Sequence, residues 1–411
     1  MPLSEKQLAS VAHADARLNL WHGAIRSGKT IGSLLRWLIY VSQAPRGGEL
    51  IVTGRTLDSI ARNVFAPLQD PTLFGPAARQ VHYTRGAHTA VMLDRTIQVI
   101  GAHDAKAEMV LRGITCAGFY GDEITTLPEP YFNQLMGRMS VPSAMGFGTT
   151  NPDNPAHWLK VNYIDRAAEL EMRIFHFLIS DNPALPAKYV EQISREYTGL
   201  WYRRFILGEW VAAEGAVYEA WDPARHVIDS DAVPRLTRML SLGIDYGATN
   251  PTAAILAGVG VDNRLYALDE WRRGQRQNGG GTTITEVSQG LREWLGDRVP
   301  SFVPVDPSAV ELKIQLRRDG VHGVMDANND VVYGIRTMAS LLAADKLRVV
   351  DRCQGLINEF PGYSWDPKAT EHGEDKPIKT ADHSLDAFRY AAISTENLWH
   401  RQLQQPTREV N

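Results

Sequence analysis

The chain has 411 residues, which is enough for two ordinary domains with a core each. Charged residues make up 22% and hydrophobic residues 44% of it, as in globular proteins, and no apolar run approaches the roughly 18 residues that a membrane-spanning helix needs. The formal net charge of −4 argues against a protein that coats nucleic acid through its overall field, although it leaves room for a local basic channel.

The first predicted elements are a strand and a helix joined by a glycine-containing turn. Residues 16–21, "ARLNLW", alternate roughly like a strand, and residues 31–43, "IGSLLRWLIYVSQ", repeat apolar residues at helical spacing. The turn between them satisfies the pattern G-x-x-x-x-G-K-[ST] through Gly23, Gly28, Lys29 and Thr30. In such a turn backbone N–H groups cradle phosphates, the lysine reaches the β- and γ-phosphates, and the hydroxyl ligates Mg²⁺. Because the match has the strand and helix that it requires, we predict a nucleoside triphosphate site rather than a chance match.

Polar residues follow two later apolar strands. Residues 116–121, "CAGFYG", end in Asp122 and Glu123, and residues 145–148 run into Thr149, Thr150 and Asn151. In phosphate-loop enzymes a carboxylate at a strand end helps to hold Mg²⁺, and an adjacent glutamate can orient or deprotonate the attacking water. We predict these two roles for the Asp–Glu pair. The second group could sense the γ-phosphate, but an ordinary proline-bounded turn would contain the same residues.

Two arginines are candidates for contacts with the γ-phosphate. Arg26 lies inside the glycine-containing turn, and Arg112 lies in "VLRGIT" just before the strand that ends in Asp122. A guanidinium near the γ-phosphate would offset the charge of the transition state. Since an arginine on a surface loop is often only solvated, both interpretations of Arg112 stay open at this point.

The pattern of apolar segments predicts two α/β domains. Buried strands alternating with helices predict a parallel-sheet domain over residues 1–215. Residues 216–237 contain proline and aspartate with little periodicity and are predicted to be a linker. A second domain is predicted over residues 238–398, and residues 399–411 are predicted to be a polar tail.

The second domain contains a second set of acidic residues. Asp245 and Asp306 each follow or interrupt an apolar strand, and a predicted helix within residues 378–392 carries Asp382, His383 and Asp386. Carboxylates from two strand ends and one helix could bind two hard cations, which activate a water and stabilise the leaving oxygen in phosphodiester cleavage. Each acid alone could instead cap or solvate its own element. Their order, strand, strand and helix, favours the nuclease interpretation.

Taken together, these segments resemble the large terminase subunit of tailed bacteriophages. The resemblance covers nearly the whole chain through "SEKQ", "GAIRSGKT", "LRG" ahead of "FYGDE", "TTNP", "RRFILGEWV", "GIDYG", "VDPSA" and "DHSLDAFRYA". It implies an ASCE-type P-loop NTPase domain followed by an RNase H-like α/β nuclease domain. It also implies a motor that uses ATP to translocate double-stranded DNA into a procapsid through the portal, and an endonuclease that cuts concatemeric genomes.

The resemblance further implies roles for residues of the first domain. Gln7 would contact adenine, while Lys29 and Thr30 would hold phosphate and metal. Asp122 would organise Mg²⁺ and Glu123 would activate water. In addition, Arg112 matches an arginine offered to the ATP of a neighbouring subunit, which implies a ring, taken as five subunits, on the portal. Residues 149–151 match the motif that couples hydrolysis to movement.

In the second domain the resemblance matches Asp245 and Asp306 to two nuclease carboxylates. The third ligand stays open between an acid and a histidine, with His383 and Asp386 favoured and Asp382 close behind. The metal would be Mg²⁺, with Mn²⁺ possible at the nuclease site.

The implied partners are double-stranded DNA, the portal protein and the small terminase subunit, with no membrane. The implied location is the host cytoplasm and, transiently, the portal vertex of the procapsid, but not the mature virion. No secretory signal is visible, and two cysteines without metal-ligand spacing suit a reducing cytosol without disulfides. Two alternatives are a helicase-nuclease, for whose second helicase domain the chain has no room, and a non-catalytic factor that docks on portals.

Overall fold

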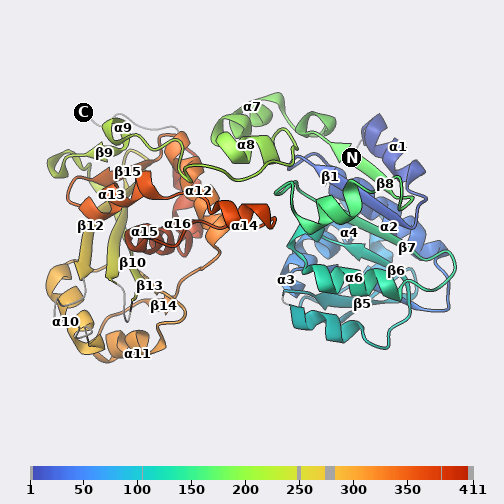
Figure 1. The fold of residues 1–411 in the computed structure, drawn as a ribbon, viewed down its shortest axis with the longest axis horizontal. Coiled ribbons are helices and arrows are strands. Elements are labelled where there is room, and N and C mark those ends of the chain that lie inside the picture. Colours follow the sequence, from blue (N-terminus) through green and yellow to red (C-terminus); the bar gives the residue numbers. More distant parts are fainter. Residues whose placement is uncertain (1–2, 104, 248–250, 274–282, 381, 406–411) are drawn as a thin grey trace. The chain divides into compact units, whose positions relative to one another are not determined.

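The computed structural model describes residues 3–103, 105–247, 251–273, 283–380 and 382–405. The chain divides into two compact units, which are described separately (Figure 1). Unit 1 comprises Met1–Ser194, Gly199–Ala213 and Lys368–Glu374. Unit 2 comprises Arg195–Thr198, Glu214–Pro367 and Asp375–Asn411. No helix among the described residues is long and apolar enough to cross a membrane.

Unit 1 is built on an eight-stranded sheet with the order β3-β4-β5-β2-β6-β7-β1-β8. The strands are β1 (Leu18–Gly23), β2 (Glu49–Gly54), β3 (Val81–His82), β4 (Thr89–Met92), β5 (Arg95–Gly101), β6 (Cys116–Gly121), β7 (Met145–Thr150) and β8 (Arg173–Phe177). All neighbouring strands are parallel except at β3/β4 and β4/β5. The carboxyl ends of β1, β6 and β7 therefore share one edge of the sheet, which places the predicted turn beside both groups of polar residues.

Helices cover both faces of this sheet. They are α1 (Glu5–His13), α2 (Lys29–Gln43), α3 (Leu57–Ile60), α4 (Ala66–Leu68), α5 (Pro71–Phe74), α6 (Glu129–Arg138), α7 (Ala187–Glu196) and α8 (Gly199–Phe205). Shorter helical turns are η1 (Ala61–Phe65), η2 (Gly75–Gln80), η3 (Ala105–Leu111), η4 (Ile124–Thr126), η5 (Lys160–Ile164) and η6 (Ile179–Asp181). Along β2, Leu50 and Val52 join the core cluster that contains α2, whereas Ile51 joins the cluster that contains α6. Successive residues of a strand face opposite sides, so both faces are buried, as the apolar strands predicted.

Unit 2 contains a seven-stranded mixed sheet with the order β14-β13-β10-β11-β12-β15-β9. The strands are β9 (Val227–Ile228), β10 (Leu236–Asp245), β11 (Thr252–Gly260), β12 (Leu265–Arg273), β13 (Val303–Val305), β14 (Val324–Asp326) and β15 (Leu347–Val350). The pairs β10/β11 and β11/β12 are antiparallel, and the others are parallel. Because Ile244 of β10 pairs with Val305 of β13 in parallel register, Asp245, the last residue of β10, and Asp306, directly after β13, lie at the same edge.

The helices of unit 2 lie on two faces of its sheet. They are α9 (Pro223–His226), α10 (Ile284–Leu295), α11 (Val310–Arg318), α12 (Val331–Ala343), α13 (Gln354–Gly362), α14 (Pro367–Glu371, largely counted in unit 1), α15 (His383–Ile393) and α16 (Glu396–Leu403), with one helical turn, η7 (Ser230–Ala232). Leu242 and Ile244 pack with α10 and α11, whereas Ser241 and Gly243 contact α15. Asp245 has the same strand parity as Gly243, so it faces α15.

A close approach fixes α15 against β10. A Cβ atom added to Gly243 would lie 1.9 Å from the carbonyl oxygen of Ala387, so only glycine allows this contact. The hydroxyl of Ser241 donates to the carbonyl of Ala391 at 2.8 Å. Every residue from Ser384 to Ile393 is buried. The helix that carries the predicted nuclease residues is thus a core helix of unit 2.

Two segments predicted to be irregular contain regular structure. Residues 216–237, predicted as a linker, are counted in unit 2 and include α9 and β9. Within this segment Trp221 stacks on Phe360 at 3.9 Å between ring centroids, which gives it packing of its own. In the predicted tail, α16 continues to Leu403 and Trp399 is buried, while residues 406–411 lie outside the described part of the chain. The domain boundaries themselves stay a prediction.

Candidate functional site

The phosphate-loop turn has the backbone shape that an anion site requires. Gly23 has a φ of +135° and Gly28, the N-cap of α2, a φ of +80°, and both values lie in the left-handed region that favours glycine. A Cβ atom at Gly23 would lie 1.9 Å from the carbonyl oxygen of Phe177. No side chain caps α2, and the N–H groups of Ile31 and Gly32 donate to the carbonyl of Gly28, so those of Lys29 and Thr30 are the ones that the start of the helix offers to a phosphate.

Gln7 lies against this turn. A Cβ atom on Gly28 would lie 2.0 Å from Gln7 Nε2, so the amide packs directly on the loop. Gln7 is also the third residue of α1, where its Oε1 accepts from the N–H of Ser4 at 2.8 Å. The structure therefore brings Gln7 to the loop and uses its oxygen within a capping box. Contact with adenine stays a prediction.

Lys29 and Glu123 are joined through Asn151. Lys29 Nζ donates to Asn151 Oδ1 at 2.7 Å, and Asn151 Nδ2 donates to both carboxylate oxygens of Glu123 at 3.1 Å. The N–H of Asn151 also donates to Glu123 Oε2 at 3.0 Å. Burial lowers the pKa of Lys29, and the charges of Glu123 and Asp122 oppose this shift. Three residues that the sequence placed on separate segments thus form one chain of hydrogen bonds.

The two acidic residues after β6 have different surroundings. Asp122 is buried and accepts a hydrogen bond from Asn63 Nδ2 at 2.9 Å. Burial and then the neighbouring charge of Glu123 raise the pKa of Asp122 to about 7. Glu123 itself has a φ of +48°, an uncommon conformation for a residue with a side chain. Asn63, in η1, was missed by sequence reasoning because nothing near it in the chain indicates a site.

Thr149 and Thr150 connect the ends of β6 and β7. The N–H of Glu123 donates to Thr149 Oγ1 at 3.4 Å, and the hydroxyls of Thr125 and Thr150 lie 2.7 Å apart. Thr30, in the first turn of α2, is half-buried beside Lys29. The predicted coupling residues therefore contact the segment that holds the predicted catalytic glutamate.

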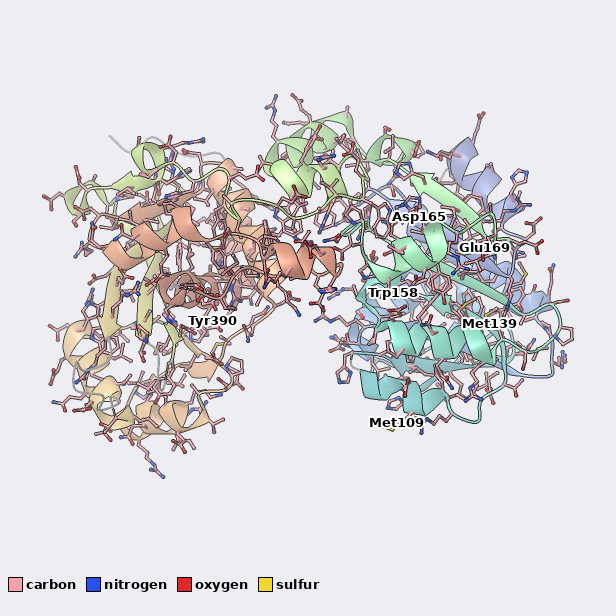
Figure 2. The ribbon with its side chains drawn as sticks, viewed as in Figure 1. Met109, Met139, Trp158, Asp165, Glu169 and Tyr390 are labelled. Atoms are coloured by element: carbon pink, nitrogen blue, oxygen red, sulfur yellow. The ribbon has the colours of Figure 1, made fainter. Side chains whose placement is uncertain are left out.

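The two candidate arginines are both exposed. Arg26 has a φ of +56°, and its carbonyl oxygen accepts from Asn182 Nδ2 at 2.7 Å. Arg112 lies just after η3, with its side chain 66% exposed and its guanidinium 3.4 Å from Glu108. Met109, labelled in Figure 2, projects from the same segment and is also exposed. Neither guanidinium contacts the Lys29–Asn151–Glu123 chain among the interactions that the structure describes.

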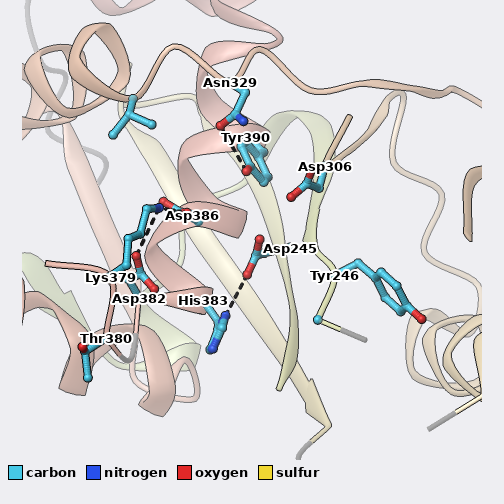
Figure 3. A pocket seen from close by; sticks show the side chains of 12 residues that line it. Asp245, Tyr246, Asp306, Asn329, Lys379, Thr380, Asp382, His383, Asp386 and Tyr390 are labelled. Carbon is cyan, nitrogen blue, oxygen red and sulfur yellow. Dashed lines mark hydrogen bonds and ion pairs between the residues drawn. The ribbon is translucent and has the colours of Figure 1, made fainter. Parts of the chain in front are cut away.

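The five predicted nuclease residues line one cavity of about 540 Å³ in unit 2 (Figure 3). They are Asp245, Asp306, Asp382, His383 and Asp386. The cavity also contains Asn329, Lys379 and Tyr390. The parallel pairing of β10 and β13 and the packing of α15 bring these residues together from distant positions in the chain.

His383 and Asp245 form a direct pair. His383 Nδ1 lies 2.9 Å from Asp245 Oδ2. Burial raises the pKa of Asp245, although the hydrogen bond from His383 opposes this shift. The same hydrogen bond raises the pKa of His383 against the opposing effect of its burial. The favoured third ligand therefore contacts the first predicted carboxylate.

Asp386 is held between two basic side chains. Lys379 Nζ donates to Asp386 Oδ2 at 2.8 Å, and Arg389 Nη2 donates to Asp386 Oδ1 at 2.9 Å. Burial alone would raise the pKa of Asp386, but the charges of Arg389 and Lys379 outweigh it and lower the pKa. Lys379 also lies 3.3 Å from Asp382 Oδ2. Sequence reasoning missed Lys379, although a lysine three residues before Asp382 was a signal.

The donors suit a divalent cation in their chemistry but are not gathered around one point. Asp306 Oδ1 accepts from the N–H and the hydroxyl of Ser308, both at 2.8 Å. Among the residues that the structure describes, no three His, Cys, Asp or Glu side chains lie close enough to share a metal ion. Carboxylate oxygens are nevertheless the ligands that Mg²⁺ and Mn²⁺ prefer. Asp245 ends β10, and Asp306 follows the neighbouring strand β13 at the cavity. The identity of the third ligand stays a prediction.

Comparison with known proteins identifies the family. Residues 22–222 match the family described as "Terminase large subunit, T4likevirus-type, N-terminal". The large terminase subunit of Escherichia phage T5 is 23% identical over 228 residues, which are 53% of this chain and 51% of that protein. This chain thus spans about half the length of that curated relative.

Solved structures extend the similarity to both units. The large terminase of a thermophilic bacteriophage is 32% identical, with a TM-score of 0.86, over 96% of this chain and 99% of that one. The same phage protein was also solved with ADP, at 33% identity and a TM-score of 0.86 over 95% of this chain and 99% of that one. These matches confirm the predicted fold class, a P-loop NTPase parallel sheet followed by an RNase H-like α/β domain. The chain belongs to the large terminase subunit family of bacteriophages.

Proposed function

We propose that this chain is the subunit of a viral DNA-packaging motor that hydrolyses ATP to translocate double-stranded DNA into the procapsid through the portal. In this proposal the same chain cuts concatemeric DNA with a metal-dependent endonuclease. The observation that carries it is the presence, in one chain, of a phosphate loop linked through Asn151 to Glu123 and of a separate acidic cavity around Asp245. Membership of the family supports it, and so does the ADP complex of the thermophilic phage relative.

The N-terminal site has the parts that ATP hydrolysis requires. The free N–H groups at the start of α2 would receive phosphate oxygens, and Lys29 would exchange Asn151 for the β- and γ-phosphates. Thr30 and Asp122 would hold Mg²⁺, which neutralises charge on the phosphates when bound. Glu123 would orient and deprotonate the attacking water. Because Asn151 bonds to both Lys29 and Glu123, it would register whether the γ-phosphate is present.

The arginines would complete this site in two ways. Arg26 lies in the phosphate loop with an exposed side chain, and we assign it to the ATP of its own subunit. The weak contact of Arg112 with Glu108, at 3.4 Å, leaves its guanidinium available to the ATP of a neighbouring subunit. This second role requires a ring, which we propose to have five subunits and to assemble on the portal.

The acidic cavity would carry the nuclease activity. Asp245 and Asp306 would hold Mg²⁺ or Mn²⁺, which activates a water and stabilises the leaving oxygen when bound. His383 fixes the orientation of Asp245 through their hydrogen bond. Lys379 balances the charges of Asp382 and Asp386, and it would move aside where these carboxylates turn to a cation.

The packaging role implies partners and a location. The partners are double-stranded DNA, the portal protein and the small terminase subunit. The protein would work in the host cytoplasm and bind only transiently at the portal vertex. A nuclease that acted without control would destroy the genome being packaged, so we expect low cleavage activity in the isolated chain.

The test is plasmid cleavage with Mg²⁺ or Mn²⁺ and ATP hydrolysis, both measured on the wild-type chain, Asp245→Ala and Lys29→Ala. We expect Asp245→Ala to lose cleavage while it hydrolyses ATP, and Lys29→Ala to show the reverse. Cleavage that survives the loss of Asp245 would show that the acidic cavity has another role. ATP hydrolysis that survives in Lys29→Ala would remove the phosphate loop from the proposal.

A further inference from the structure

The amino end of α15 is capped by a residue from another helix. Glu359 lies in α13, is buried, and points its carboxylate at the start of α15. Glu359 Oε2 accepts from the N–H of Ser384 at 2.8 Å and from the N–H of Leu385 at 3.0 Å. These are the second and third residues of the helix, whose N–H groups a helix normally offers to its own N-cap side chain.

The N-cap residue of α15 is Asp382, which makes no side-chain capping bond. Three other N-cap aspartates behave differently, whereas Asp229, at the short turn η7, also makes no side-chain capping bond. Asp70, Asp222 and Asp330 each accept a hydrogen bond from an N–H in the first turn of their own helix. Aspartate is among the best N-cap residues, so its failure to cap needs a reason. Two features account for it: Glu359 already takes both N–H groups, and the backbone of Asp382, at φ −120° and ψ 11°, lies outside the extended region that the three capping aspartates adopt.

The carboxylate of Asp382 is thereby left in the acidic cavity. It lines the cavity with Asp245 and lies 3.3 Å from Lys379 Nζ (Figure 3). The backbone of Asp382 still begins the helix, because its carbonyl accepts from the N–H of Asp386 at 2.8 Å. The backbone of Asp382 thus begins the helix, while its side chain lines the cavity.

Glu359 is itself held firmly in place. Arg272, in β12, donates to Glu359 Oε1 at 2.6 Å and to the hydroxyl of Ser384 at 2.8 Å. The same hydroxyl donates to Glu270, also in β12. Since the positive charge of Arg272 balances the buried carboxylate, the cap is anchored to the central sheet rather than to a surface loop.

We propose that Glu359 is a positioning residue of the nuclease site: by capping α15 in place of Asp382, it keeps the Asp382 carboxylate in the cavity for a divalent cation. This inference rests on the proposed nuclease function. Without Glu359, the N–H groups of Ser384 and Leu385 would lose this acceptor. We expect the backbone of Asp382 then to shift to the extended conformation of a capping aspartate and to turn its side chain from the cavity to the helix.

The test measures Mn²⁺ binding to the full chain by titration calorimetry and by the paramagnetic resonance signal of free Mn²⁺. Binding that is lost in Asp245→Ala defines the component that belongs to the cavity. In Glu359→Ala we expect the Mn²⁺ affinity of the cavity to fall about tenfold to 100-fold. This is the usual loss when a residue that orients a metal ligand is removed. Asp382→Asn should cause a loss of similar size, and the double variant should lose no more than either single one.

Two further variants separate positioning from simple stability. Glu359→Gln keeps an acceptor for the N–H groups and should retain most of the affinity. Thr283→Ala removes the cap of α10, whose side chain accepts from the N–H of Glu286, and should destabilise unit 2 without changing Mn²⁺ binding. Where Glu359→Ala does not fold, Glu359→Asp takes its place. Its shorter side chain can pair with Arg272 but cannot reach both N–H groups, so its affinity should also fall.

The outcomes distinguish the inference from the function on which it rests. Wild-type Mn²⁺ affinity in Glu359→Ala or Glu359→Asp, or losses that multiply in the double variant, would overturn the inference alone. If Asp245→Ala binds Mn²⁺ as tightly as the wild type and still cleaves DNA, the nuclease proposal itself is wrong, and the inference about Glu359 loses its basis.

Discussion

The two candidate sites of this chain hold their charged side chains in place with different contacts. In unit 1, Lys29 and Glu123 are separated by the neutral amide of Asn151, which bonds to both. In unit 2, Asp386 is paired directly with Lys379 and Arg389. When Lys29 leaves Asn151, the amide that remains carries no charge, whereas a lysine or arginine that leaves Asp386 uncovers a buried carboxylate. The first arrangement suits a site that turns over repeatedly, and the second suits a site that is held inactive until a cation enters.

The largest effect should come from removing a carboxylate of the cavity. Asp306→Asn keeps the shape of the side chain but removes a charge that a divalent cation requires, so we expect cleavage to fall by about 100-fold or more. Plasmid cleavage with Mn²⁺ measures it. Asp326→Asn is the matched control, because Asp326 pairs with Val305 at the end of the neighbouring parallel strand and lies outside the cavity. Equal losses in both variants would contradict the assignment of Asp306.

A smaller effect should come from breaking the neutral bridge of unit 1. Asn151→Ala leaves Glu123 without its orienting amide, and we expect kcat for ATP hydrolysis to fall about tenfold, a part of the roughly 100-fold that a positioned general base contributes. The KM for ATP should change little. Asn162→Ala is the control, since Asn162 donates to the carboxylate of Glu129 at 2.8 Å outside the site. A change in KM alone would mean that Asn151 only binds nucleotide.

The position of α15 can be tested through its contact with β10. A methyl group at Gly243 would meet Ala387, so Gly243→Ala should destabilise unit 2 by about 1 to 3 kcal/mol and reduce cleavage. ATP hydrolysis should be unaffected at a temperature where unit 2 stays folded. Gly362→Ala adds a methyl group where no atom lies within 4 Å and should be nearly neutral. Unchanged thermal unfolding of Gly243→Ala would show that α15 can shift freely.

The smallest effect is expected at an ion-pair cluster that does not line the cavity, formed by Asp345 with Arg225, Arg264 and Arg348. It tests charges that contribute to stability only. Partial burial would raise the pKa of Asp345, but hydrogen bonds from Arg348, Arg264 and Arg225 outweigh it and hold the pKa below its ordinary value. The lowered pKa means that this contribution to stability is present at neutral pH and is lost as the pH falls through the carboxyl range.

Asp345→Asn should therefore cost about 1 kcal/mol at neutral pH, and the difference from wild type should shrink in acid. Asparagine tolerates the φ of +60° at this position, so the substitution removes the charge and one hydrogen-bond acceptor without straining the backbone. Urea unfolding at several pH values measures it. Added Mn²⁺ should not alter the difference in the free energy of unfolding between Asp345→Asn and the wild type. A clear effect of Mn²⁺ on that difference would link this cluster to the acidic cavity.

Much of the fold was predictable because its signals are local. The strand at residues 116–121, the phosphate-loop turn and the helix containing Asp386 are present as predicted. The strand predicted over residues 145–148 continues to Thr150, and Asp382, predicted to lie on the helix, is its N-cap. Periodicity failed where tertiary packing decides the structure. Residues 216–237 have little periodicity, yet Trp221 stacks on Phe360, a contact between segments far apart in the chain.

The order of the amino acids is enough to specify the local chemistry: a loop whose glycines, lysine and threonine can bind phosphate, and acids that follow apolar strands. Those features depend on neighbours in the chain, so their pattern is readable there. Which charged groups meet depends instead on the folded arrangement. Asn151 bridges Lys29 and Glu123, and Glu359 caps α15 in place of Asp382, because strand pairing and helix packing bring distant segments within hydrogen-bond distance.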